Sequence, residues 1–260
     1  MKSNIRFIVR LWKYSIKSAL TYRVNFLVQA GATVLNNSIY FVFWIIFFSR
    51  VISVETYSLN DMLLQFSIVT GAYGVAYTFW GNSAGLARII INGELDYYIL
   101  FPRNVLLNLS SAKFYVSSTG DFIFGLLILV YLHPSIKTIL FWIMFVIIGS
   151  IIVVMVNIIL GSMTFWLGNV EQLSGVISEA IVTFSLYPNN IYKGIVKIIL
   201  LSIIPAGYLG AIPLKIIQGE GYIYVFYLIG FTFVLFCLAL KLFYSGLKRY
   251  ESSNLININM

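Results

Sequence analysis

Residues 138–167 read TILFWIMFVIIGSIIVVMVNIILGSMTFWL and contain no charged side chain. About 20 apolar residues in a helix cross the ~30 Å hydrocarbon core of a bilayer. Similar runs recur along the chain, in which 60% of the 260 residues are hydrophobic and only 10% are charged. Soluble domains carry roughly 25% charged residues. The sequence therefore predicts an all-α integral membrane protein with no room for a separate soluble catalytic domain.

Six membrane-spanning helices are predicted from the apolar runs. Their approximate bounds are 23–48, 62–80, 114–132, 138–167, a short span that follows the polar loop 169–175 and ends at 187–188, and 222–244. A further run, 191–204, has about 14 residues, or about 21 Å of helix, which is too short to cross the bilayer. Pro205, Gly207, Gly210 and Pro213 interrupt the chain after it. We expect a re-entrant pair of half-helices here, because broken backbone at membrane depth is tolerated only inside protein or along a cavity.

These elements divide one transmembrane domain, residues 1–260, into six parts. The parts are an interfacial helix (1–22), spans one and two (23–80), a cytoplasmic loop (81–104), spans three to five (105–187), a re-entrant outer segment (188–221), and span six with a cytoplasmic tail (222–260).

The N-terminal part carries basic side chains at helical spacing. Arg6, Arg10, Lys13 and Lys17 fall on one narrow stripe of a helix, beside an apolar face. This pattern predicts an amphipathic helix at the lipid headgroups, with its cations toward anionic lipid. A surface helix packed on a partner subunit is the alternative.

The net charge of +8 would favour nucleic acid as a partner of a soluble protein. In a membrane protein the positive-inside rule explains it better, so no nucleic-acid partner is expected. With six spans, six basic residues up to residue 23, three in 88–113 and three in 241–249 fall on one side, out of 17. We therefore expect a multi-pass protein of the cytoplasmic membrane with both termini in the cytoplasm.

The residue types that most enzymes and metal proteins need are scarce in this sequence. One histidine, His133, and one cysteine, Cys237, are too few for a bis-histidine haem, a thiolate cluster or an internal disulfide. The G-x-x-x-x-G-K-[ST] phosphate loop is absent from the sequence, so the chain alone does not bind and hydrolyse ATP in the usual way. We expect no catalytic residue, cofactor or metal in this chain, which is not an enzyme.

Two carboxylates fall inside predicted spans, Asp121 in the third and Glu179 in the fifth. Ionisable groups inside a membrane are costly and often functional. Both are therefore candidates for the lining of a polar pathway. The alternative for each is a structural hydrogen bond to a neighbouring helix.

The loop after the second span holds the most specific pattern. Residues 83–91 predict a short helix with Leu86, Ile89 and Ile90 on one side, and Asn92-Gly93 end it. The ordered sequence Gly93-Glu94-Leu95-Asp96 follows, and Pro102 closes the loop. We expect the apolar side of this helix to dock in a groove of another protein, with the carboxylates at the rim.

This loop resembles that of the ABC-2 type transporter permeases, in the six-span group that reads roughly I-x-x-G-E-L-D-x-x-L-x-x-P. The matching residues are Ile90, Gly93, Glu94, Leu95, Asp96 and Pro102, with Ile99 in place of the leucine. Phe101 stands where an arginine is common, and Arg103 follows the proline. A second likeness lies before the last span, in Tyr187-Pro188, Tyr192, Ile204-Pro205 and Ile212-Pro213.

The resemblance implies the permease subunit of an ATP-driven exporter. Two ATP-binding-cassette subunits would bind the ATP and Mg, and a second permease, identical or related, would complete the path. The loop would be the coupling helix seated in the ATPase, formed by Leu86, Ile89, Ile90, Gly93, Glu94, Leu95, Asp96 and Pro102. The broken segment with Pro188, Tyr192, Pro205 and Pro213 would approach the outer gate.

Two other functions are weighed against this one. A membrane scaffold or anchor that transports nothing would share the composition. An ion-coupled carrier working alone is disfavoured, because the two halves of the sequence show no internal repeat.

Overall fold

The computed structural model describes residues 2–51, 57–188, 191–195, 199, 204–221 and 223–251. The regular elements within them are helices, as the sequence predicts. They are α1 (Lys2–Thr21), α2 (Arg23–Arg50), α3 (Leu59–Trp80), the 3-10 helix η1 (Gly81–Gly85), α4 (Leu86–Ile91), α5 (Leu95–Ile99), α6 (Val105–Ser110), α7 (Ser117–Tyr131), α8 (Ile136–Ser162), α9 (Thr164–Leu167), α10 (Glu171–Ser185), α12 (Ala206–Leu209), α13 (Ala211–Gln218) and α14 (Ile223–Leu247).

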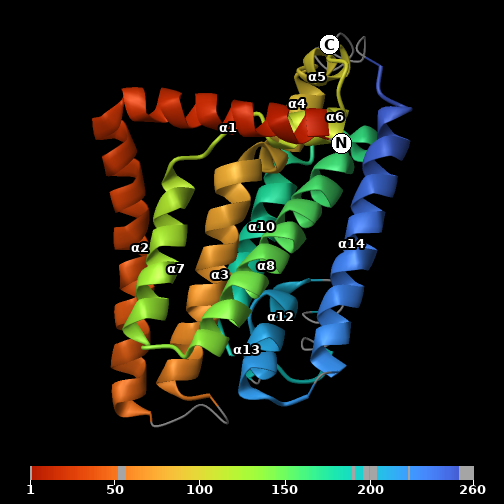
Figure 1. The fold of residues 1–260 in the computed structure, drawn as a ribbon. Coiled ribbons are helices and arrows are strands. Elements are labelled where there is room, and N and C mark those ends of the chain that lie inside the picture. Colours follow the sequence, from red (N-terminus) through yellow and green to blue (C-terminus); the bar gives the residue numbers. More distant parts are fainter. Residues whose placement is uncertain are drawn as a thin grey trace.

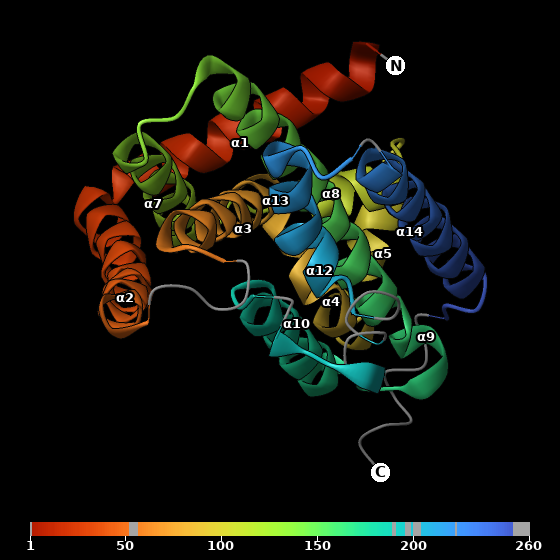
Figure 2. The same ribbon diagram turned by 90° about the horizontal axis from the view of Figure 1, so that it is seen from below.

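Helix α3 lies at the centre of the bundle. It packs between α7 and α8, while α2 lies on the far side of α7 and α14 on the far side of α8 (Figures 1 and 2). Most of its side chains are buried, among them Met62, Leu63 and Phe66. Because protein surrounds α3 on nearly all sides, apolar side chains occur around its whole circumference.

Small polar groups link the three central helices. Ser67 Oγ on α3 donates a hydrogen bond to the Gly125 carbonyl oxygen on α7 at 2.7 Å, and Trp142 Nε1 on α8 donates to Ser67 Oγ at 2.8 Å. A Cβ on Gly125 would lie 2.8 Å from the Ser67 carbonyl oxygen, so only glycine allows this approach. Such contacts replace the hydrophobic driving force that helices lack inside lipid. They hold α3, α7 and α8 together.

Four helices of the described chain are long and apolar enough to cross a membrane. They are Arg23–Arg50, Leu59–Ile91, Ile136–Leu167 and Ile223–Leu247. Helices α7 and α10 have only 15 residues each, or about 22 Å of length. The chain is therefore a multi-pass membrane protein, whereas six spans stay a prediction.

The third span was expected at about 114–132, and α7 (Ser117–Tyr131) lies within these bounds. One predicted loop is wrong. The polar loop expected at 169–175 is mostly helix, since α10 begins at Glu171, whose N–H donates to Asn169 Oδ1 at 3.0 Å. Gly168, with φ of 76°, makes the turn that separates α9 from α10. The Asn169 hydrogen bond and a glycine with positive φ therefore shorten this loop.

Helix α1 lies across the end of the bundle where α4 and α5 also lie (Figure 1). Trp12 Nε1 donates to the Phe79 carbonyl oxygen on α3 at 2.9 Å. The exposed basic side chains are Arg6, Arg10, Lys13 and Lys17. The charged stripe therefore points away from the protein, and its position at lipid headgroups stays a prediction.

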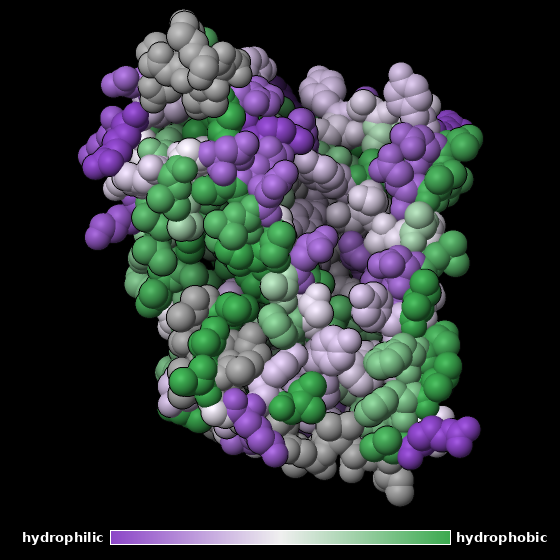
Figure 3. Space-filling view, turned by 180° about the vertical axis from the view of Figure 1, so that it is seen from behind, coloured by the Kyte–Doolittle hydropathy of each residue, from purple (hydrophilic) through white to green (hydrophobic). Residues whose placement is uncertain are grey.

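Helices α12 and α13 lie at the opposite end, packed against α3 and α8. Half of the apolar run 191–204 lies outside the described residues, as do Tyr222 and the tail 252–260. The re-entrant path of 188–221 therefore stays a prediction. Figure 3 shows the back of the molecule, where a paler, hollowed strip separates two hydrophobic areas.

Candidate functional site

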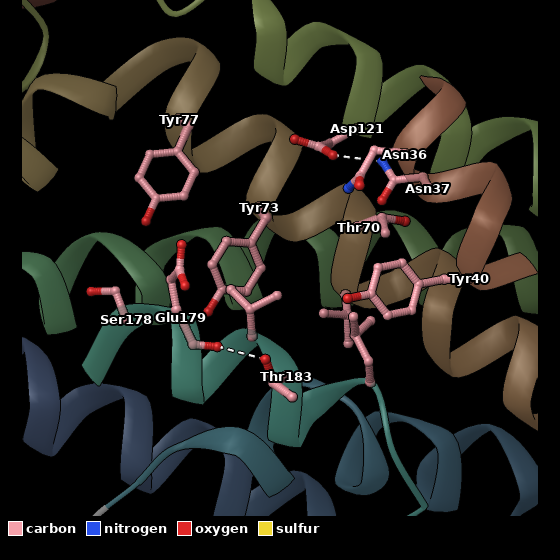
Figure 4. Close-up of a pocket in the computed structure, with 13 residues that line it drawn as sticks. Asn36, Asn37, Tyr40, Thr70, Tyr73, Tyr77, Asp121, Ser178, Glu179 and Thr183 are labelled. Carbon is pink, nitrogen blue, oxygen red and sulfur yellow. Dashed lines mark hydrogen bonds between the residues drawn. The ribbon is translucent and has the colours of Figure 1, made fainter. Parts of the chain in front are cut away.

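A cavity of about 430 Å³ lies among α2, α3, α7 and α10. Asp121 from α7 and Glu179 from α10 both line it. Figure 4 shows the two carboxylates on either side of the α3 tyrosines. The fold therefore brings to one cavity the two carboxylates that the sequence singles out.

A hydrogen bond from the neighbouring helix α2 positions Asp121. Its Oδ1 accepts a hydrogen bond from Asn37 Nδ2 on α2 at 2.7 Å, and Asn37 is buried. This is the structural hydrogen bond that was the alternative to a pathway role. Because Asp121 also lines the cavity, the bond positions the carboxylate there and leaves its other oxygen available.

Two tyrosines on α3 form the floor between the carboxylates. Tyr73 and Tyr77 are one turn apart, with ring centroids 5.8 Å apart. Tyr73 is only 7% exposed, and its hydroxyl has no hydrogen-bond partner among the residues that the structure describes. Sequence reasoning missed both residues, although their spacing of four places them on one helix face.

The loop of residues 81–104 is built from η1, α4, α5 and α6. Leu86 is 0% exposed, and Ile89 and Ile90 are also buried. They pack on α8, where Gly161 leaves room: a Cβ there would come 2.6 Å from the Leu86 Cβ. The expectation that this apolar face enters a groove of another protein is therefore wrong. Because α3 continues through η1 into α4, the face turns toward the chain's own α8.

The outward surface of the loop is made by α5 and the residues after it. Gly93, with φ of 72°, turns the chain between α4 and α5. Tyr97 and Ile99 are exposed, and Leu100 is 84% exposed. Helix α5 extends beyond α1 at this end of the molecule (Figure 1).

The remaining loop residues divide between the two sides. Leu95 is buried, Asp96 is half-buried, and Glu94 and Pro102 are exposed. Burial, with the nearby Asp96 carboxylate as a smaller cause, raises the pKa of Tyr250 to about 12. Asp96 therefore faces the start of the C-terminal tail rather than open solvent.

The family profile described as ABC-2 family transporter protein matches residues 34–254. The chain belongs to the ABC-2 transporter family. The match begins inside α2 and includes the cavity, the loop and the segment before α14, whereas α1 precedes it. No curated protein and no solved structure matches the chain.

In this ABC-2 family protein, a glutamine ties the end of α10 to the bundle. Gln65 Nε2 on α3 donates to the carbonyl oxygens of Ser185 at 2.8 Å and Tyr187 at 3.0 Å. Gln65 is buried and sits at the end of α10. A lone polar residue in an apolar run was the signal that sequence reasoning missed, because such a residue inside lipid needs a partner.

The four residues predicted for the outer gate lie at this end, in separate contacts. Pro188 is buried just after α10, and the Tyr192 ring lies 5.7 Å from that of Phe184. Pro205 immediately precedes α12, and Pro213 lies in the first turn of α13. Proline is tolerated in both places, because first-turn N–H groups have no helical partner.

Proposed function

We propose that this chain is the permease subunit of an ATP-driven exporter in the cytoplasmic membrane. Two ATP-binding-cassette subunits would supply ATP hydrolysis, with their own ATP and Mg, and a second permease would complete the path. Membership of the ABC-2 family supports a permease role. The observation that carries the proposal is the loop, which is anchored on one side and presents exposed apolar side chains on the other.

The anchored side explains how a push on the loop would reach the bundle. Leu86 and Ile89 are packed on α8, so α4 moves with α8 rather than bending alone. Protein interiors are close-packed and transmit displacement. A closing ATPase dimer that pushes α5 would therefore shift the balance between inward-open and outward-open states.

The exposed side revises which residues would touch the ATPase. Tyr97, Ile99 and Leu100 are exposed apolar side chains outside the bundle, and aromatic and apolar anchors supply most of the energy of protein contacts. Glu94 and Pro102 are also exposed in this loop and would fix the register. Gly93 and Leu95 would shape this surface, while Leu86, Ile89 and Ile90 would support it from inside.

A contact links the loop to the cavity. Arg88 Nη1 on α4 lies 4.0 Å from Glu171 Oε1, the first residue of α10, and both are about half exposed. Such a pair stabilises little. Since α10 also carries Glu179, however, a movement of α4 would shift the cavity wall through this contact.

The topology completes the proposal. Six crossings by α2, α3, α7, α8, α10 and α14 would return the chain to the side of α1, with both termini in the cytoplasm. The short helices α7 and α10 are packed against longer ones, and a short span can be accommodated by local bilayer thinning. The outer gate would lie at the α12 end.

The test is affinity purification of the tagged full-length chain from membranes. We expect a co-purifying chain with a phosphate-binding loop, and Leu100→Asp should abolish its capture while Leu100→Met keeps it. The permease itself should remain monodisperse in both variants, because Leu100 is exposed. Purification of a partner set without any ATPase would instead support a scaffold. Full capture by Leu100→Asp would show that the ATPase binds elsewhere.

A further inference from the structure

The charges that face the cavity have one sign. Asp121 and Glu179 are its ionisable carboxylates, and none of the described residues that line it is Lys, Arg or His. Asp121 receives one hydrogen bond from Asn37, and the Glu179 carboxylate receives none from the residues that the structure describes. The fold therefore supplies no internal cation to balance either group at the cavity.

The second observation is independent of the carboxylates. Tyr73 is more than nine-tenths buried and lines the cavity, and Figure 4 shows its hydroxyl directed toward the wall formed by Glu179 and Thr183. In the described part of the chain this hydroxyl has no partner. A hydroxyl without a protein partner favours a ligand or water that can accept its hydrogen bond. This hydroxyl is therefore available to a ligand or a water molecule in the cavity.

The lining also offers aromatic surface. Tyr40 from α2 and Tyr73 and Tyr77 from α3 all line the cavity, with Tyr40 on the side away from Glu179 (Figure 4). The faces of aromatic rings attract cations, and quaternary ammonium groups are bound by aromatic cages in this way. An apolar body would be accepted by Val69 and Leu186 in the same wall. A volume of about 430 Å³ suits a drug-sized molecule.

We propose that this cavity binds an organic cation, a positively charged nitrogen or phosphorus centre carried on an apolar body, and that such cations are the substrates of this permease. The proposal rests on the proposed export function. A cation would balance Asp121, which is partly buried, and Glu179, which is exposed in the isolated chain, whereas an anion would add a third negative charge. A neutral ligand would leave both carboxylates uncompensated, which is costly inside a membrane.

The test is binding of a pair of ions of similar shape and opposite charge. Full-length permease in nanodiscs of zwitterionic lipid is incubated with radiolabelled tetraphenylphosphonium or tetraphenylborate. We expect saturable binding of the phosphonium only. Asp121→Asn and Glu179→Gln should each weaken it roughly tenfold, as loss of a partly screened charge would. Asp121→Asn keeps an oxygen for the Asn37 bond, so the wall should stay intact.

Two further variants separate charge from position. Glu251→Gln removes an exposed carboxylate outside the cavity and should leave binding unchanged. Tyr73→Phe keeps the ring and removes the hydroxyl, so we expect a loss of only a few-fold. Retained thermal stability of each variant shows that a loss of binding is not a loss of fold.

Equal binding of both ions, or unchanged phosphonium affinity in Asp121→Asn and Glu179→Gln, would overturn the proposal. Binding needs no ATPase, so this outcome is distinct from failure of the export function. Phosphonium binding without any ATPase partner would leave a cation site in a protein that does not export. ATP-driven export of another substrate without phosphonium binding would leave the function and remove the cation.

Discussion

The loop of residues 81–104 is packed against the bundle on its inner side, whereas the cavity among α2, α3, α7 and α10 leaves polar groups without partners. In the loop, Leu86 and Ile89 are buried and Gly161 makes room for them. In the cavity, the Tyr73 hydroxyl and the Glu179 carboxylate lack partners in the described chain. The difference separates two tasks: a tightly packed region transmits movement, and an open polar region receives a ligand.

The largest expected effect is on the anchored side of the loop. Leu86→Asp would bury an unpaired carboxylate, at a cost of roughly 3–5 kcal/mol, so we expect loss of the folded, monodisperse permease. Glu179→Leu at the cavity should leave thermal stability unchanged or raised, since it removes an uncompensated charge. Unfolding curves of both variants in detergent compare their stabilities. Equal stability of the two would contradict the difference between the packed loop and the open cavity.

A smaller effect is expected from adding one methyl group. Gly161→Ala places a Cβ against the Leu86 side chain and should cost about 1–3 kcal/mol by overpacking. Gly175 in α10 has no neighbour within 4 Å of the same position, so Gly175→Ala should be neutral or stabilise by about 0.5–1 kcal/mol. The same measurement compares the two. A destabilising Gly175→Ala would mean that a second chain packs on this face of α10.

The smallest effect concerns pH at the loop. Burial and the nearby Asp96 raise the pKa of Tyr250 from 10.0 to about 12. The folded state then holds this proton more tightly than the unfolded state. The stability that the folded state gains from holding this proton is therefore fully present below about pH 10 and is lost as the pH rises toward 12. Difference absorbance at 295 nm of wild type against Tyr250→Phe follows this ionisation. An ordinary tyrosine pKa would show that the tail is not packed on the loop.

The two regions also differ in how far the sequence reveals them. The loop motif is local, so Gly93, Glu94, Leu95 and Asp96 can be recognised from the chain alone. An amphipathic pattern, however, does not say whether its apolar face meets the same chain or another one. For that reason the inward direction of Leu86 and Ile89 was not predicted.

The cavity depends on four helices that are far apart in sequence. Asp121 and Glu179 stand out because carboxylates are rare in apolar runs, but nothing in the sequence says that they share a cavity. Tyr73 resembles many other tyrosines in spans until its neighbours are known. The bounds of the long apolar helices follow closely from the sequence: the first span was expected at 23–48, and α2 is Arg23–Arg50.

The hydrogen bonds of α7 have a consequence for how the protein is made. Helix α7 is short and carries Asp121, so by itself it is a poor candidate for insertion. The partner groups that it needs, Asn37 on α2 and Ser67 on α3, are translated before it. The segments that carry these partner groups are therefore synthesised before α7. The order of synthesis thus provides hydrogen-bond partners for a helix whose insertion into lipid alone is unfavourable.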